Sequence, residues 1–91
     1  MLSARATIVN RLGLHARPAM AFVEEASKFD AEITVKKLGD GETVDGKSIL
    51  QMLMLAGTCG TVIEITADGG DAKQAIEALL ALVDSKFGED E

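Results

Sequence analysis

The stretch ARATIVNRLGLHARPAMAFVEEASKF, residues 4–29, changes its hydrophobic period from two to about 3.6. Residues 4–10 alternate between an apolar side and a more polar side, which predicts a half-buried strand. After a short connection, apolar side chains recur at helical spacing, which predicts an amphipathic helix from Ala16 to Phe29. Pro18 lies in its first turn, where the missing N–H breaks no intrahelical bond.

The rest of the chain continues this mixture of strands and helices. Alternation predicts further strands at residues 32–37, 42–44 and 61–67, and helical spacing predicts helices over residues 49–56 and 72–87. The apolar stripe of the last helix is Ala72, Ala75, Ile76, Leu79 and Val83. Gly39-Asp40-Gly41 indicates a hairpin turn, and Gly57 a helix end. Asp45 or Ser48 is placed to cap the second helix, and Asp71 with Gln74 resembles a capping box for the third. The order β-α-β-β-α-β-α predicts an α+β sandwich with helices on one face of an open sheet.

Length and charge narrow the possible functions. The 91 residues allow one small domain, which we place at residues 1–88, with an acidic tail at 89–91. The net charge is −6 and only 3% of the residues are aromatic, which argues against nucleic acid and anionic membranes as partners. Seven of the nine basic residues lie in residues 1–47, so a site for an anion belongs in that half.

Cysteine content and hydropathy indicate the compartment. The single cysteine, Cys59, excludes an internal disulfide, as suits a reducing cytosol, and we read it as a small loop residue. Residues 1–5 lack the apolar stretch of a signal peptide, and no run approaches the roughly 20 apolar residues of a membrane span. We therefore expect a soluble cytoplasmic protein. One histidine and one cysteine cannot form a structural zinc site, so no metal is expected.

His15, the only histidine, lies where the first loop meets the start of a helix. A helix start offers unpaired N–H groups and the positive end of the dipole, which Ala16 and Arg17 can supply. Arg17 adds a cation whose planar fork suits phosphate oxygens. A neutral imidazole in such an anion site can accept a phosphoryl group. A lone histidine after a loop is more often an ordinary surface residue than a catalyst, so spacing alone favours that interpretation.

The residues around His15 add a resemblance. Gly13-Leu14-His15-Ala16-Arg17-Pro18-Ala19 closely resembles the active-site signature of the HPr family, the histidine-containing phosphocarriers of the bacterial phosphoenolpyruvate phosphotransferase system. Residues 45–50, DGKSIL, resemble the family's second signature. The resemblance extends over nearly the whole chain. It implies the HPr-like open-faced β-sandwich, with four antiparallel strands and three helices on one face.

The resemblance also implies a function. His15 matches the phosphorylated histidine, which carries phosphate on Nδ1, and Arg17 matches the arginine beside it. The backbone N–H groups of Ala16 and Arg17 would bind the phosphate. The expected partners are enzyme I as donor and an enzyme II A-type component as acceptor, and the expected protein is a monomer. Such a carrier is itself the phosphorylated substrate, so neither a cofactor nor independent turnover is implied.

Two further features have a structural and a functional interpretation. Ser48 is a helix cap by spacing, and by resemblance it matches the serine that HPr kinase/phosphorylase modifies in many bacteria. The second helix is apolar nearly all round, so it is either buried entirely or a docking surface. By resemblance, the positions that meet partners are Met20, Ile49, Leu50 and Leu53.

Three other functions share part of this sequence pattern. A carrier of the nitrogen-regulatory branch of the phosphotransferase system would look the same at His15. A purely regulatory HPr-like module lacking the histidine is disfavoured because His15 and Arg17 are both present. An acyl carrier requires an aspartate directly before its serine and an all-helical fold, whereas Lys47 precedes Ser48 here and four segments have strand periodicity.

Overall fold

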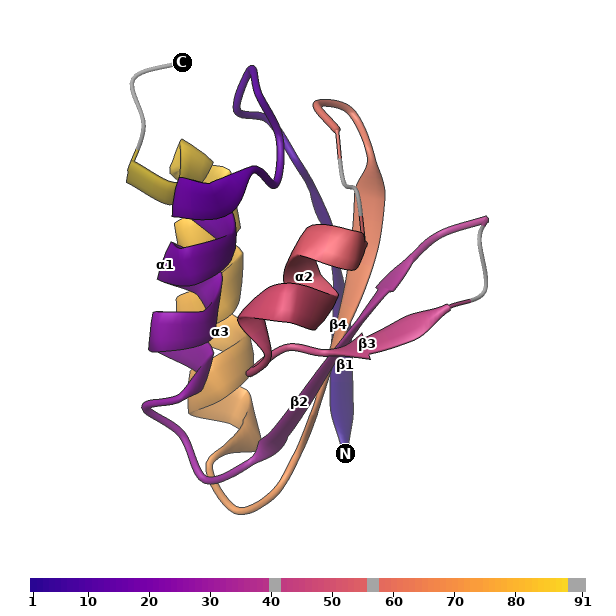
Figure 1. Ribbon diagram of the computed structural model, residues 1–91. Coiled ribbons are helices and arrows are strands. Elements are labelled where there is room, and N and C mark those ends of the chain that lie inside the picture. Colours follow the sequence, from indigo (N-terminus) through magenta and orange to yellow (C-terminus); the bar gives the residue numbers. More distant parts are fainter. Residues whose placement is uncertain (40–41, 56–57, 89–91) are drawn as a thin grey trace.

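A computed structural model describes residues 1–39, 42–55 and 58–88 of the chain. Four strands and three α-helices follow one another in the predicted order, with a final 3₁₀ turn: β1 (Leu2–Thr7), α1 (Ala16–Ala26), β2 (Glu32–Lys37), β3 (Thr43–Asp45), α2 (Ile49–Met54), β4 (Val62–Asp68), α3 (Ala72–Asp84) and η1 (Lys86–Gly88). The strands form one antiparallel sheet in the order β1-β4-β2-β3. All three helices cover one face of this sheet (Figure 1). The predicted fold class is confirmed.

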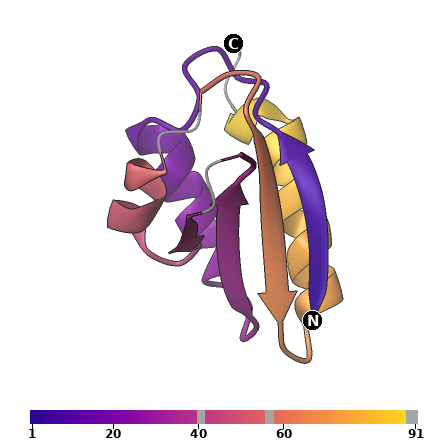
Figure 2. The same cartoon turned by 90° about the vertical axis from the view of Figure 1, so that its right-hand side faces the viewer.

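The two faces of the sheet differ as the alternation predicts. The covered face contributes fully or almost fully buried aliphatic side chains from the central strands, which are Ile33, Val35, Ile63, Ile65 and Ala67. In the part of the chain that the structure describes, no helix lies over the other face (Figure 2). There the register places Glu64 between Arg5 and Lys36, and the Arg5 Nε lies 3.7 Å from a Glu64 carboxylate oxygen. This face therefore has charged side chains in register on three neighbouring strands.

The two long helices, α1 and α3, close the core with their apolar sides. On α1 the buried side chains are Pro18, Ala19, Phe22 and Ala26. On α3 all five residues of the predicted stripe are buried, namely Ala72, Ala75, Ile76, Leu79 and Val83. Phe22 and Leu79 are completely buried, and such side chains contribute about 1.5–3 kcal/mol each on transfer from water. Among the described residues, no helix combines the length and apolarity needed to cross a membrane.

Several element ends differ from the prediction by one to three residues. β1 ends at Thr7 rather than Asn10, although Ile8 continues to exchange backbone hydrogen bonds with Gly60 and Thr61. α1 ends at Ala26 rather than Phe29, because residues 28 and 29 bond to carbonyls only three positions back. This tightening is typical of a helix terminus. β4 is displaced by one residue from the predicted 61–67, and β3 by one from 42–44.

The last two helices are shorter than predicted. α3 stops at Asp84 because Lys86 and Phe87 adopt left-handed backbone angles, with φ of 60° and 56°. The reversal turns Phe87 back into the core, where it is 7% exposed. α2 ends at Met54, with Leu55 as its C-cap. Residues 40–41, 56–57 and 89–91, on which the hairpin turn, the Gly57 helix stop and the acidic tail fall, lie outside the described residues.

The capping box predicted for α3 is wrong. Asp71 is the N-cap residue, but its side chain makes no cap hydrogen bond. Its two carboxylate oxygens instead accept the backbone N–H groups of Asp30 and Ala31, at 2.8 and 2.9 Å. Lys47 reaches the same region, because its Nζ donates to the carbonyl of Phe29 at 2.7 Å. Three loops distant in sequence are thus joined at one end of the sheet.

Candidate functional site

The loop between β1 and α1 is fixed at both of its ends. At its start, the Ile8 N–H donates to the Thr61 carbonyl at 2.9 Å, and the Ile8 carbonyl accepts from the Gly60 N–H at 2.7 Å. At its end, Leu14 is buried in the core. The loop therefore lies beside the segment before β4 (Figure 1). It presents the next residue, His15, from an anchored backbone.

Asn10 and Gly13 close a tight turn within this loop. The Gly13 N–H donates to the Asn10 carbonyl at 3.2 Å, and the Asn10 Nδ2 donates back to the Gly13 carbonyl at 2.7 Å. Gly13 has φ of 67°, in the left-handed region that residues with a Cβ adopt only at a cost. The same Gly13 carbonyl also accepts the N–H of His15 at 3.0 Å. Glycine at position 13 thus shapes the approach to the histidine.

His15 is the N-cap residue of α1, as predicted from its position. Its backbone is extended, with φ of −86° and ψ of −170°, and its carbonyl accepts the Ala19 N–H at 3.0 Å. The ring does not cap the helix, and the residue is partly exposed. Ala16 and Arg17 follow as exposed first-turn residues. Their N–H groups have no carbonyl partner within the helix, and Pro18 has no N–H to offer.

These groups together favour a bound anion. The start of α1 carries about half a positive charge, and its first turn contains no acidic side chain. An anion at such a terminus gains roughly 0.3–1 kcal/mol, increased by hydrogen bonds to N–H groups and by an arginine. The partly exposed His15 begins this helix, and an imidazole has the chemistry of a nucleophile. The arrangement suits brief covalent storage of an anionic group.

Ser48 is the N-cap of α2, which confirms the structural interpretation. Its Oγ accepts the Gln51 N–H at 3.3 Å. The Gln51 side chain reaches back in turn and accepts the Asp45 N–H at 2.8 Å. Sequence reasoning missed Gln51, although Ser-x-x-Gln is a capping-box spacing. Asp45, the other candidate cap, instead accepts the Lys47 N–H at 2.9 Å within the preceding turn.

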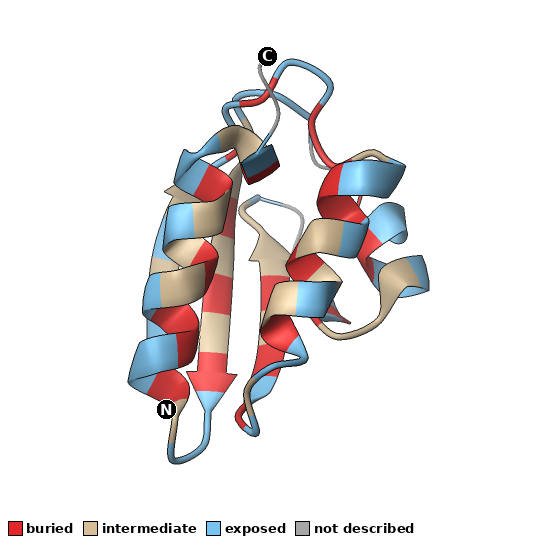
Figure 3. Cartoon of the chain, turned by 90° about the vertical axis from the view of Figure 1, so that its left-hand side faces the viewer, coloured by how far each residue is buried: buried red, intermediate tan, exposed pale blue. Residues whose placement is uncertain are grey.

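The second helix is not buried entirely. Its residue Met52 is inside the core, whereas Leu50 is 71% exposed and Leu53 39%. Met20 on α1, which packs beside α2, is 54% exposed, and Ile49 is half-buried. On α2 the structure adds a strongly exposed side chain that the sequence did not single out, Met54 at 76%. Figure 3 shows the exposed positions along these helices. We call Met20, Leu50, Leu53 and Met54, which lie on the neighbouring helices α1 and α2, the apolar surface.

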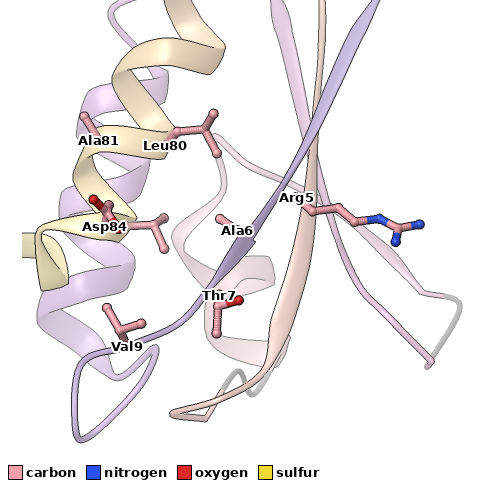
Figure 4. Close-up of a pocket in the computed structure, with 8 residues that line it drawn as sticks. Arg5, Ala6, Thr7, Val9, Leu80, Ala81 and Asp84 are labelled. Carbon is pink, nitrogen blue, oxygen red and sulfur yellow. The ribbon is translucent and has the colours of Figure 1, made fainter.

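A hollow and a cysteine in the described part of the chain lie outside the histidine site and the apolar surface. A hollow of about 390 Å³ lies between β1 and α3, lined by Arg5, Ala6, Thr7, Val9, Leu80, Ala81, Val83 and Asp84. Figure 4 shows Leu80 directed toward β1 and Arg5 directed away from α3. Cys59 is exposed and is not part of a disulfide. The residues that the structure describes contain no group of three potential metal ligands.

Comparison with known proteins decides the family. A sequence model described as the phosphotransferase-system HPr component phosphorylation site matches residues 2–85. The chain belongs to the HPr family. Phosphocarrier protein HPr of Neisseria meningitidis serogroup A is 45% identical over 91 residues, covering all of both chains. Phosphocarrier protein NPr of Proteus mirabilis is 42% identical over 86 residues, covering 94% of each.

The HPr fold is equally clear from solved structures. HPr-C-His from Thermoanaerobacter tengcongensis superposes with a TM-score of 0.94 at 44% identity, over the full length of both chains. An HPr from the same organism has also been crystallised as a dimer, with a TM-score of 0.77 at 45% identity, covering 98% of this chain and 100% of that one. HPr is therefore both the sequence family and the structural family of this chain.

Proposed function

We propose that this protein carries a phosphoryl group on His15, taking it from phosphorylated enzyme I and passing it to an enzyme II A-type acceptor. The observation that carries the proposal is the position of His15, which is the N-cap of α1, partly exposed and followed by exposed Arg17. Membership of the HPr family supports the same assignment. The protein would act in the cytoplasm, where phosphoenolpyruvate is available.

The transfer needs little from the carrier beyond position and charge. A neutral ring nitrogen of His15 attacks the phosphorus. The new N–P bond forms as the bond to the donor breaks, and the donor keeps the electron pair. The N–H groups of Ala16 and Arg17, with the Arg17 guanidinium, stabilise the oxygens of the transferred group. Because the site is open, it holds this group without trapping it, which suits a carrier.

The apolar surface is the proposed docking site for both partners. It combines an exposed methionine on α1 with leucines of α2, and α1 also begins at the histidine. Methionine side chains adapt to differently shaped partners, which suits a protein that meets a donor and an acceptor in turn. Of the predicted contact residues, Ile49 is the least available because it is half-buried.

Ser48 is the proposed regulatory site. A phosphate on its oxygen would add nearly two negative charges next to Ile49 and Leu50. The helix start tolerates such a charge, so we expect α2 to persist and docking to weaken. An HPr kinase/phosphorylase would be the modifying enzyme. This proposal is separate from the role of His15.

The branch of the phosphotransferase system is a second question. An HPr relative at 45% identity favours sugar uptake, and an NPr relative at 42% identity favours the nitrogen-regulatory branch as the alternative. Both branches use the same histidine chemistry. They would differ in which acceptor removes the phosphoryl group.

Intact mass spectrometry tests the carrier proposal. The protein is incubated with phosphoenolpyruvate, Mg²⁺ and enzyme I from its own organism, and His15→Ala is the matched control. We expect one acid-labile phosphate on the wild type and none on the variant. An unmodified wild type, or equal phosphate on the variant, would exclude the carrier function. A regulatory binding module acting through the apolar surface would then be the better explanation.

A further inference from the structure

We infer that Asn10 is a positioning residue for the phosphorylation site, acting on His15 through the carbonyl of Gly13. The inference rests on the proposed carrier function and extends it to a residue outside the family signature at positions 13–19. Asn10 is completely buried, and it is the only buried polar or charged residue in the described ranges 1–39, 42–55 and 58–88. A buried amide is retained where its hydrogen bonds matter.

One oxygen connects Asn10 to the histidine. The Gly13 carbonyl accepts the Asn10 Nδ2 at 2.7 Å and the His15 N–H at 3.0 Å. The side-chain amide therefore fixes the direction of the carbonyl, and the carbonyl fixes the N–H of the N-cap residue. Because Gly13 has a left-handed backbone and glycine has the widest conformational freedom, this turn would relax easily without that bond.

The position of the N-cap residue sets the geometry of the anion site. His15 has ψ of −170°, and this angle places the Ala16 N–H relative to the ring. A phosphoryl group on the ring can bond the N–H groups of Ala16 and Arg17 only if the cap keeps this conformation. Asn10 thus contributes to phosphate binding without touching the phosphate. Misplacement of a reacting group by about 1 Å can cost as much as a hundredfold in rate.

The substitution Asn10→Leu tests this role, since leucine fills a similar volume but has no donor. Protein labelled with ¹⁵N is phosphorylated with phosphoramidate, from which the His15 nitrogen displaces ammonia as one P–N bond forms and one breaks. ¹H–¹⁵N NMR spectra are recorded before and after phosphorylation. In the wild type we expect the amide proton signals of Ala16 and Arg17 to shift downfield on phosphorylation. In Asn10→Leu these changes of chemical shift should be less than half of those in the wild type. The rate of phosphoryl transfer from enzyme I should fall about tenfold.

A matched core variant separates positioning from stability. Ile65→Val removes one methylene from a completely buried residue of β4, so it lowers the melting temperature without touching the loop. In this variant, the chemical-shift changes of the Ala16 and Arg17 amides and the transfer rate should be the same as in the wild type. Asn10→Ala is the second variant if Asn10→Leu does not fold, because alanine also has no donor for the Gly13 oxygen. We expect the same reduction of the amide chemical-shift changes in this second variant.

The outcomes distinguish this inference from the carrier proposal. The positioning role would be overturned if the folded Asn10 variant showed the same changes of amide chemical shift as Ile65→Val. So would a wild type whose two amide signals do not move with phosphoramidate, whether or not His15 takes up phosphate. A wild type that accepts phosphate from phosphoramidate but not from enzyme I would remove the carrier function, while the amide comparison would still decide on Asn10.

Discussion

The carboxylate of Asp71 accepts the backbone N–H of Ala31 at 2.9 Å, across 40 positions of the chain. Its other oxygen accepts the N–H of Asp30 at 2.8 Å. These two hydrogen bonds lower the pKa of Asp71, and the bond from Asp30 has the largest effect. Desolvation acts in the opposite direction, and the positive charge of Lys47 lowers the pKa further. One side chain thus ties the start of α3 to the loop between α1 and β2, and it does so as an anion.

This lowered pKa predicts a pH-dependent effect of Asp71→Asn. The ionised carboxylate stabilises the folded state above the unfolded pKa of about 3.9, and that contribution is lost as the pH falls through the lower folded pKa. Urea unfolding should therefore show the variant less stable than the wild type at pH 7, with the difference shrinking as the pH falls below about 4. The control Glu77→Gln, on the exposed side of α3, should show little difference at pH 7. A constant gap between pH 7 and pH 2.5 would contradict the assignment.

The close approach of Gly46 to β2 predicts a second stability effect. A Cβ at position 46 would lie 2.7 Å from the Cγ2 of Ile33, while the Gly46 N–H donates to the Ile33 carbonyl at 2.8 Å. Gly46→Ala should cost about 1–3 kcal/mol in the free energy of unfolding, through overpacking beside a fixed backbone. Gly70→Ala is the matched control, because a Cβ there has no atom within 4 Å. Equal stabilities of the two variants would refute the steric argument.

Ser48 provides a test in which stability and docking separate. Ser48→Ala removes the oxygen that accepts the Gln51 N–H, and should cost about 0.5–1 kcal/mol because the bond is long at 3.3 Å. Ser48→Asp keeps a good cap and should retain the wild-type melting temperature. Its charge should nevertheless slow transfer from enzyme I severalfold if Ser48 is regulatory. A wild-type transfer rate in Ser48→Asp would count against regulation by charge.

The apolar surface predicts a kinetic effect without a structural one. Leu50 is 71% exposed, so Leu50→Gln should leave the free energy of unfolding within about 0.5 kcal/mol of the wild type. It should raise the KM of enzyme I for this protein about tenfold and change kcat little, because docking is lost while His15 is intact. Leu2→Gln offers an exposed leucine on β1, outside the apolar surface, and should leave KM unchanged. An unchanged KM in Leu50→Gln would remove Leu50 from the docking surface.

The sequence predicts the element order and the buried stripes because these depend on periodicity alone. The stripe on α3, from Ala72 to Val83, is buried at every predicted position. The helix ends are less predictable because they depend on single backbone conformations. Nothing local in residues 84–87 indicates that Phe87 turns back to the core with φ of 56°. Tertiary burial of one aromatic ring decides that end.

The candidate site shows the same division. The position of His15 at a helix start follows from the change of period at residue 16, and Ser48 as a cap follows from residue type. The contact between Asn10 and Gly13 could not be predicted, since an asparagine in a loop usually faces water. Asp71 was misread for a related reason, because its local spacing to Gln74 fits a cap while its partners lie 40 and 41 residues away.

The sheet order β1-β4-β2-β3 has a consequence for how the chain acquires its structure. Among the described strands, β1 pairs only with β4. Residues 2–7 therefore cannot form their strand pairing until residues 62–68 are present. During synthesis, the β2–β3 hairpin can form while β1 is still unpaired. The contacts that complete the sheet are thus the most distant in sequence, and such pairings slow folding relative to helical bundles of the same size. A nascent chain stalled before residue 62 should therefore remain sensitive to proteases at its N-terminus until β4 is available.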